Sequence, residues 1–181
     1  MINQHLTTTI EELEATISRL RWDTSFGMLN PAGLHEAIRQ LPEGQYTVIF
    51  ADVDHMKHIN SATGSHCKTD RYLTAGLKVR EGEIAGRIHG DEIIYILDEQ
   101  SRGEDADPHA FVARIARQLA GQPLTISEKY ILAAAQGVHV SQAKLSATFA
   151  CASSVAAHEI LSTIETLSSD VLLMKSRRDQ G

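Results

Sequence analysis

The stretch Tyr46-Thr47-Val48-Ile49-Phe50-Ala51-Asp52-Val53-Asp54-His55-Met56-Lys57 decides the fold of this chain. Its first part is apolar and β-branched, which indicates a strand buried on both faces. The strand ends in Asp52 and Asp54, which point the same way because side chains alternate along a strand. Two carboxylates followed by Lys57 suit a divalent cation that carries phosphates. The alternative is a strand that ends in an ordinary polar turn.

A second stretch, Gly86 to Leu97, predicts two short strands joined by a tight turn. Gly90 gives the turn its backbone freedom. Asp91 and Glu92 lie beside the turn, where they would face the end of the first strand and complete a metal site. A solvated Gly-Asp turn is the alternative interpretation.

Three motifs then occur in order between about residues 23 and 97. The segment RIHGDEI resembles the signature of GGDEF domains, with His89 in place of the first glycine. The segment FADVDHMKHINSATGSHCKTDRYL resembles the nucleotide-binding strand, helix and loop of that family, and DTSFGMLNPAGL resembles its opening turn. The chain is therefore similar to a GGDEF domain of the diguanylate cyclase family, with a variant His-Gly-Asp-Glu-Ile signature.

This resemblance implies an α/β (α+β) fold like the palm of nucleotidyl cyclases, in which a central, partly antiparallel sheet is flanked by helices. We expect residues 1–22 to form an N-terminal helical arm and residues 23–181 to form the GGDEF-like domain. The patterns of the chain predict helices at 31–40, 55–61, 68–78, 107–119 and 155–178, the last of which can break near 168–170, a linker at 101–108, and further strands at 130–135 and 145–152.

The resemblance also implies the site. Mg²⁺ or Mn²⁺ would be held by Asp52, the Val53 carbonyl and Asp91, with Asp91 and Glu92 as the catalytic residues. The substrate-binding positions that match the family are Lys57, Asn60, His66, Asp70, Arg87, Gly90 and Arg177.

The substrate-binding positions have different expected partners. Asn60 and Asp70 would read the guanine edge, although both residue types are also common helix caps. Lys57 and Arg87 would bind the β- and γ-phosphates. Arg177 stands at the lysine position of the family's closing helix, but it could equally be part of a basic helix end that complements the helix dipole.

The implied reaction joins two GTP molecules into cyclic di-GMP with release of two pyrophosphates, in a homodimer that places one GTP in each half-site. Three alternatives remain open. The chain could be a degenerate domain that binds GTP or a partner without catalysis, or a structural dimerisation module. A cyclase with altered base choice is the third, because the loop between Asn60 and Asp70 is one residue longer than usual and Thr69 replaces a glycine.

The N-terminal arm carries a heptad seam of Leu6, Ile10, Leu13, Ile17 and Leu20. This seam predicts either a dimer stalk or a helix packed on its own domain.

The composition bounds the class of protein. An apolar fraction of 43% can form a sizeable core, and a net charge of −6 argues against non-specific nucleic-acid binding. No apolar run is long enough to insert into a membrane and no signal peptide is visible. Two cysteines give no disulfide framework, so we expect a cytoplasmic chain, whether whole or part of a larger sensor protein.

One more departure from the family concerns feedback. Arg80-Glu81-Gly82-Glu83 stands where many GGDEF domains carry the Arg-x-x-Asp site that binds product. Glu83 replaces the aspartate, and its longer side chain would displace the carboxylate. We therefore expect weak or absent product inhibition, and an ordinary charged turn is the alternative.

Overall fold

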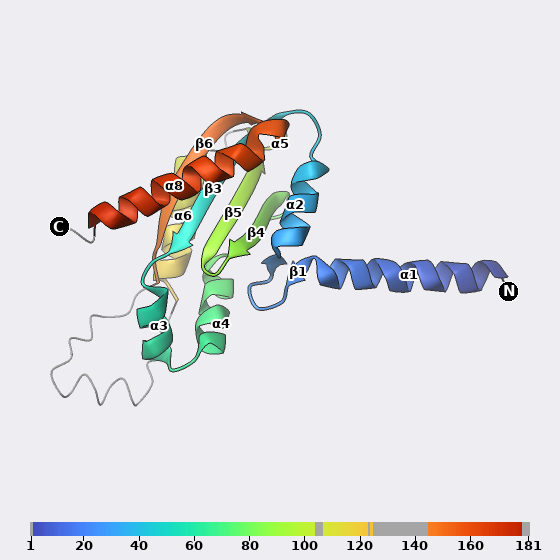
Figure 1. Ribbon diagram of the computed structural model, residues 1–181, viewed down its shortest axis with the longest axis horizontal. Coiled ribbons are helices and arrows are strands. Elements are labelled where there is room, and N and C mark those ends of the chain that lie inside the picture. Colours follow the sequence, from blue (N-terminus) through green and yellow to red (C-terminus); the bar gives the residue numbers. More distant parts are fainter. Residues whose placement is uncertain (1, 104–106, 123, 125–144, 179–181) are drawn as a thin grey trace.

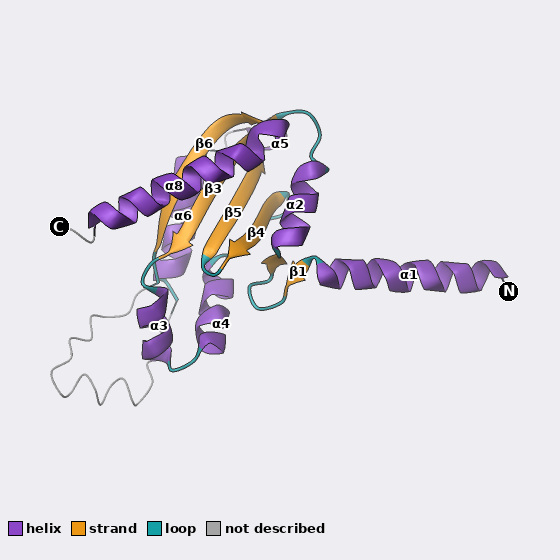
Figure 2. Cartoon of the chain, in the orientation of Figure 1, coloured by secondary structure: helices purple, strands orange, loops and turns teal. Residues whose placement is uncertain are grey.

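A six-stranded mixed sheet forms the centre of the computed structural model, with strands in the order β1-β2-β4-β5-β3-β6 (Figure 2). The structure describes residues 2–103, 107–122, 124 and 145–178. The neighbouring strands β2 and β4 are parallel and the other neighbours are antiparallel. The strands are β1 Trp22–Asp23, β2 Met28–Leu29, β3 Gln45–Val53, β4 Glu83–His89, β5 Glu92–Asp98 and β6 Ala147–Ala156.

Helices cover both faces of the sheet. Helices α2 and α8 lie on one face, whereas α6 lies on the other and α3 and α4 lie beyond the end of β3 (Figure 1). The helices are α1 Ile2–Leu20, α2 Pro31–Arg39, α3 Met56–Thr63, α4 His66–Gly76, α5 Glu99–Arg102, α6 Pro108–Ala120 and α8 Ile160–Arg178. This arrangement confirms the predicted α/β architecture.

Strand β3 is the buried centre of the sheet, as its sequence predicts. Its alternate residues Val48 and Phe50 join the core beneath α2 and α8, whereas Ile49 and Ala51 join the core beneath α3, α4 and α6. Because side chains alternate, Asp52 continues the set that faces α8. The strand therefore directs this carboxylate toward the C-terminal helix.

The β4–β5 hairpin meets the end of β3 in a defined register. Strand β5 is antiparallel to β3 and places Glu92 opposite Asp52. Beyond the last strand pair, the Val53 N–H donates to the Asp91 carbonyl at 3.2 Å. Gly90 has φ +51°, so the turn uses the left-handed conformation that glycine adopts readily.

Several predicted element limits were wrong. The last helix begins at Ile160 rather than 155, because β6 continues through Ala156 and a short 3₁₀ turn follows. The helix is also continuous through 168–170, where the Ser169 hydroxyl donates to the Glu165 carbonyl at 3.0 Å. Helix α3 continues to Thr63, and α4 begins before the predicted start and ends before residue 78.

The two predicted late strands have different outcomes. The strand predicted at 145–152 is confirmed by β6, which pairs antiparallel with β3. The strand predicted at 130–135 lies outside the described residues.

Helix α1 extends away from the sheet (Figure 1). Its seam residues are solvent-exposed: the exposed fractions are 55% for Ile10, 58% for Leu13, 46% for Ile17 and 69% for Leu20. The seam is therefore not packed on its own domain along this stretch, and the Leu6 side chain lies outside the described residues. Of the helices in the described part of the chain, none is both long enough and apolar enough to cross a bilayer.

Candidate functional site

The first carboxylate of the candidate site belongs to Asp52, the second-last residue of β3. It is 9% exposed, and burial raises its pKa. A hydrogen bond and the positive charge of Lys175 oppose this rise, whereas the negative charges of Asp91 and Asp54 add to it. A nearby cation therefore stabilises the charged form of Asp52.

Asp54 has a different role, although it comes only two residues later. It lies in the turn after β3, and its carboxylate accepts hydrogen bonds from Ser146 Oγ at 2.8 Å, Thr148 Oγ1 at 2.7 Å and Arg178 Nη2 at 2.8 Å. Burial would raise the pKa of Asp54, but these hydrogen bonds outweigh burial and lower it to about 2. Asp54 thus fastens the last turn of α8 to the start of β6.

Lys175 is the residue at this site that sequence reasoning did not assign. Its Nζ lies 2.5 Å from Asp52 Oδ1 and 3.2 Å from the Val53 carbonyl oxygen. The cation expected from the family pattern, Arg177, is exposed on the same helix. A signal was available, because the buried stripe of Ile160, Ile164, Leu167 and Val171 continues at helical spacing to residues 175 and 178.

The hairpin brings two further carboxylates to this end of the sheet. Asp91 is half-buried in the turn and is close enough to Asp52 to raise its pKa. Burial raises the pKa of Glu92, and the negative charges of Asp52 and Asp91 raise it further, whereas His89 and Lys175 lower it. A carboxylate with a raised pKa is a stronger base, which suits a proton acceptor.

The predicted ligand set has the donor atoms that a divalent cation needs. Among the described residues, no three His, Cys, Asp or Glu side chains gather as a metal centre. The candidate set is instead two carboxylates, Asp52 and Asp91, and one backbone carbonyl, that of Val53. All three are hard oxygen donors of the kind that Mg²⁺ and Mn²⁺ bind. A cation, the Lys175 ammonium, already contacts two of the three groups, so the set fits a cation.

Arg87, predicted as a phosphate ligand, already has protein partners. Its Nη1 lies 3.1 Å from Asp23 Oδ2, its Nε donates to the Gly90 carbonyl, and its guanidinium carbon lies 3.9 Å from the centroid of the Phe26 ring. These contacts connect the opening turn of the domain to the hairpin. In this structure Arg87 stabilises the turn that carries Asp91.

The residues predicted to read the base come from α3 and α4, beyond the same end of the sheet (Figure 1). Asn60 Oδ1 is buried and accepts no hydrogen bond from any residue that the structure describes. A buried oxygen without a hydrogen-bond donor destabilises the folded protein. This oxygen is therefore suited to accept a hydrogen bond from a ligand N–H. Asp70 is half-buried in α4 and Lys57 is exposed in the first turn of α3. The His66 side chain lies outside the described part.

Thr69, which replaces a glycine of the family pattern, forms a hydrogen bond with Thr63. Its hydroxyl lies 2.9 Å from the Thr63 hydroxyl, and both residues are fully buried. Thr63 ends α3, and Gly64, with φ +74°, follows it. The longer loop is therefore accommodated by a hydroxyl pair that joins the end of α3 to the start of α4.

Glu83, the expected variant of the product-binding site, is buried at the start of β4. Its side chain is 1% exposed and contacts Arg114 Nη2 at 2.6 Å and Arg102 Nη2 at 3.1 Å. Its second oxygen accepts from the Arg80 backbone N–H at 2.7 Å. The carboxylate thus points into the protein, and the weak product inhibition expected from the sequence stays a prediction.

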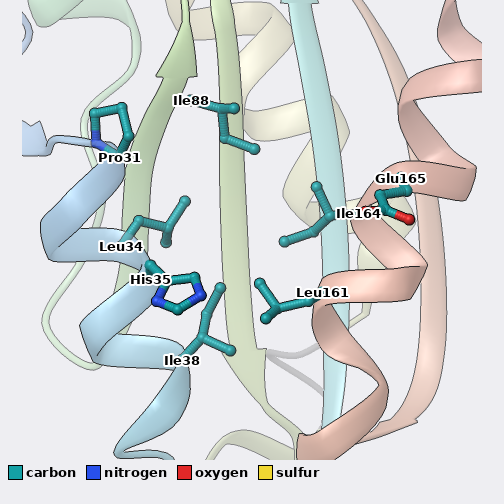
Figure 3. Close-up of a pocket in the computed structure, with 8 residues that line it drawn as sticks. All are labelled: Pro31, Leu34, His35, Ile38, Ile88, Leu161, Ile164 and Glu165. Atoms are coloured by element: carbon teal, nitrogen blue, oxygen red, sulfur yellow. The ribbon is translucent and has the colours of Figure 1, made fainter.

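A separate groove lies between α2 and α8 on the sheet face (Figure 3). It has a volume of about 340 Å³ and apolar walls from Leu34, Ile38, Ile88, Leu161 and Ile164. None of the predicted site residues lines it. The groove is therefore distinct from the carboxylate cluster at the end of β3.

Comparison with known protein families defines the class. Residues 31–158 match the sequence profile of the family described as "Diguanylate cyclase, GGDEF domain". The match covers more than half of the chain, so this protein belongs to the GGDEF domain family. The search of curated proteins gave no match.

Solved structures share the same fold. The diguanylate cyclase SiaD from Pseudomonas aeruginosa, solved with its activator SiaC, is 20% identical with a TM-score of 0.66, over 97% of this chain and 66% of that chain. The coiled coil and GGDEF domain of DgcB from Caulobacter crescentus, solved with c-di-GMP, is 14% identical with a TM-score of 0.62, over 96% and 90%. The FimX GGDEF domain from P. aeruginosa is 10% identical with a TM-score of 0.58, over 83% and 93%. At these identities, the likeness establishes the fold alone.

Proposed function

We propose that this domain is a metal-dependent diguanylate cyclase that condenses two GTP molecules into cyclic di-GMP and releases two pyrophosphates. The observation that carries the proposal is the convergence of Asp52, the Val53 carbonyl and the Asp91 hairpin at one end of the sheet, with a cation already against two of them. Membership of the GGDEF family supports the same reaction.

The proposed roles follow from the chemistry of each group. Asp52, the Val53 carbonyl and Asp91 would hold Mg²⁺ or Mn²⁺, which when bound lowers the pKa of the ribose 3′-hydroxyl and offsets charge at the α-phosphate. Glu92 or Asp91 accepts the hydroxyl proton. The pairing of Glu92 with Asp52 in the β3–β5 ladder supports Glu92 as the acceptor.

Other residues bind and orient the nucleotide. The Asn60 oxygen, which accepts no hydrogen bond from the described residues, accepts from the guanine edge, Asp70 accepts from ring N–H and amino groups, and His66 lies in the same segment. Lys57 and Arg177, both exposed cations, bind phosphate oxygens. For Arg87 we propose an indirect contribution, since its contacts hold the Gly90 turn in place.

The reaction requires two domains, because each contributes one GTP. The exposed seam of α1, at Ile10, Leu13, Ile17 and Leu20, supports pairing of two copies through a coiled coil. We propose that the active form is a cytoplasmic homodimer, either alone or within a larger sensor.

A non-catalytic GTP-binding module is the second candidate. The observation that favours it is the Lys175 ammonium, which contacts two groups of the proposed metal site. Arg87 is also held by protein groups rather than presented to a ligand.

Product analysis separates the candidates. The purified dimer is incubated with GTP, ATP or both, with Mg²⁺ or Mn²⁺, and products are identified by chromatography and mass spectrometry. We expect cyclic di-GMP from GTP alone. GTP that binds in an Asn60-dependent manner but gives no product would establish the binding module, and a mixed cyclic dinucleotide would establish altered base choice.

A further inference from the structure

Lys175 connects the C-terminal helix to the oxygens assigned to the metal. Its Nζ contacts Asp52 Oδ1 at 2.5 Å and the Val53 carbonyl oxygen at 3.2 Å, and it lies 3.7 Å from Asp54 Oδ1. The Lys175 side chain is 20% exposed, so the ammonium is largely shielded from water.

The path of α8 holds Lys175 in this place. Val171, one turn earlier, is fully buried against the sheet. Arg178, three residues later and on the same side of the helix, contacts Asp54 through both terminal nitrogens, at 2.8 Å and 3.3 Å. Lys175 lies between these two attachment points, so its approach to Asp52 follows from the packing of the helix.

An ammonium and a divalent cation cannot share these oxygens. Mg²⁺ binds its oxygen ligands at about 2.1 Å. A metal on Asp52 and Val53 would then lie within a few ångströms of the Lys175 Nζ, where two positive charges repel strongly in a partly buried site. The Asp54 oxygen at 3.7 Å offers the ammonium another partner at the same end of the sheet.

We propose that Lys175 is a built-in counter-cation of the metal-free domain and that it must leave Asp52 and Val53 before a divalent cation binds. The inference rests on the proposed metal site. It assigns Lys175 two effects: the side chain stabilises the domain without metal and lowers its affinity for metal. Metal binding is thereby coupled to a movement of a side chain on the last helix.

The test measures metal binding without nucleotide. Mn²⁺ affinity is determined by the electron paramagnetic resonance signal of free Mn²⁺ for the full chain, for Lys175→Met and for the second variant Lys175→Gln. We expect Mn²⁺ to bind at least about tenfold more tightly to both variants. The matched control is Arg177→Met, which removes one exposed positive charge from the same helix turn and should change the affinity less than about threefold.

Thermal unfolding gives an independent measurement. In EDTA, Lys175→Met should unfold at a lower temperature than wild type, and saturating Mn²⁺ should raise its unfolding temperature more than that of wild type. Equal or weaker Mn²⁺ binding by both Lys175 variants, with binding still lost in Asp52→Asn, would overturn the role of Lys175 while leaving the metal site in place. Mn²⁺ binding that Asp52→Asn does not weaken in either background would overturn the metal site itself.

Discussion

Two clusters of charged side chains in this domain differ in their balance of charge. At the start of β4, the single carboxylate of Glu83 faces the guanidinium groups of Arg102 and Arg114. At the end of β3, the four carboxylates of Asp52, Asp54, Asp91 and Glu92 lie near the cations Lys175 and Arg178, and His89 also lowers the pKa of Glu92.

The difference distinguishes a charge-balanced structural cluster from the cluster to which we assign the proposed metal. The Glu83 cluster has enough positive charge to satisfy its carboxylate and gains nothing from a further cation. Among the described residues, the cluster at the end of β3 has more carboxylates than cations, and the pKa values of Asp52 and Glu92 stay raised despite the nearby positive charges, so this cluster gains from a further cation. An unbalanced cluster of oxygen donors is what a metal site requires.

The largest expected effect comes from removing a carboxylate of the unbalanced cluster. We expect Asp52→Ala and Asp91→Ala each to reduce turnover by about 10³-fold or more, because each deletes a donor to the cation that stabilises the transition state. Both variants should remain folded, since the remaining carboxylates repel one another less and Asp54 still lies near Lys175 when Asp52 is removed. Steady-state product formation and circular dichroism measure the two properties.

The control for these two variants is Asp170→Ala, which removes an exposed carboxylate from α8 and should keep the wild-type rate. If Asp52→Ala or Asp91→Ala kept wild-type rates and normal Mg²⁺ dependence, the site assignment would be wrong.

The next largest effect concerns stability in the balanced cluster. Glu83→Gln keeps the shape of the side chain but leaves Arg102 and Arg114 without their counter-charge. We expect a loss of about 3 kcal/mol in the free energy of unfolding, as for other buried ion pairs that lose one partner. Urea unfolding measures it. Glu81→Gln, an exposed neighbour, should change stability by less than about 0.5 kcal/mol, and equal losses in the two variants would contradict the comparison.

A smaller effect is expected from acid at Asp54. Its pKa in the folded state is about 2, below the usual value of 3.8, so its ionised form stabilises the fold above pH 3.8 and this contribution is lost as the pH falls toward 2. Wild type should therefore be about 2 kcal/mol more stable than Asp54→Asn at pH 6, with the difference shrinking below pH 4.

The pH comparison must be made between the two proteins, because Asp52 and Glu92 respond in the opposite direction. Their pKa values are raised, so acid relieves the cost of their charges. Asp52 and Glu92 are present in both wild type and Asp54→Asn. Their contributions therefore largely cancel in the difference between the two free energies of unfolding. Urea unfolding at a series of pH values gives the result, and a constant difference from pH 6 to pH 2.5 would refute the assigned pKa.

The smallest effect is expected at His89. The positive φ in the turn belongs to Gly90, whereas His89 ends strand β4 without a positive φ. A glycine at position 89 therefore relieves no backbone strain, and His89→Gly should change the cyclase rate by less than about tenfold, or about 1.4 kcal/mol of barrier. The rates of product formation by the wild-type and His89→Gly dimers, measured in parallel, test this prediction. An inactive wild type with an active His89→Gly would mean that His89 switches the enzyme off.

The sequence contained enough local information to predict most of the fold. The apolar run of β3, the glycine turn of the hairpin and the polar breaks between helices all act over a few residues. The carboxylates Asp52 and Asp91 were predicted together, because strand order and hairpin geometry bring the ends of β3 and β5 to one place.

The cations of the site depend on longer-range structure. Which basic residue of α8 reaches Asp52 depends on where β6 ends and on how the helix crosses the sheet, and Lys175 is more than 120 residues from Asp52 along the chain. The partners of Arg87 depend in the same way on the position of Asp23 in the opening turn. The resemblance to the family's closing helix predicted Arg177 as the cation of the site. The helical spacing of the buried residues of α8 indicates Lys175 instead.

The hydrogen bond between the Val53 N–H and the Asp91 carbonyl has a consequence for how such domains diversify. The spacing of the two candidate metal carboxylates is set by the strand ladder between β3 and β5, so it does not depend on the length of the chain that runs through α3 and α4. Under the proposed roles, an inserted residue between Asn60 and Asp70 would reshape base recognition while the ladder keeps its register. The proposed substrate choice and the proposed cation binding would thus be able to evolve independently.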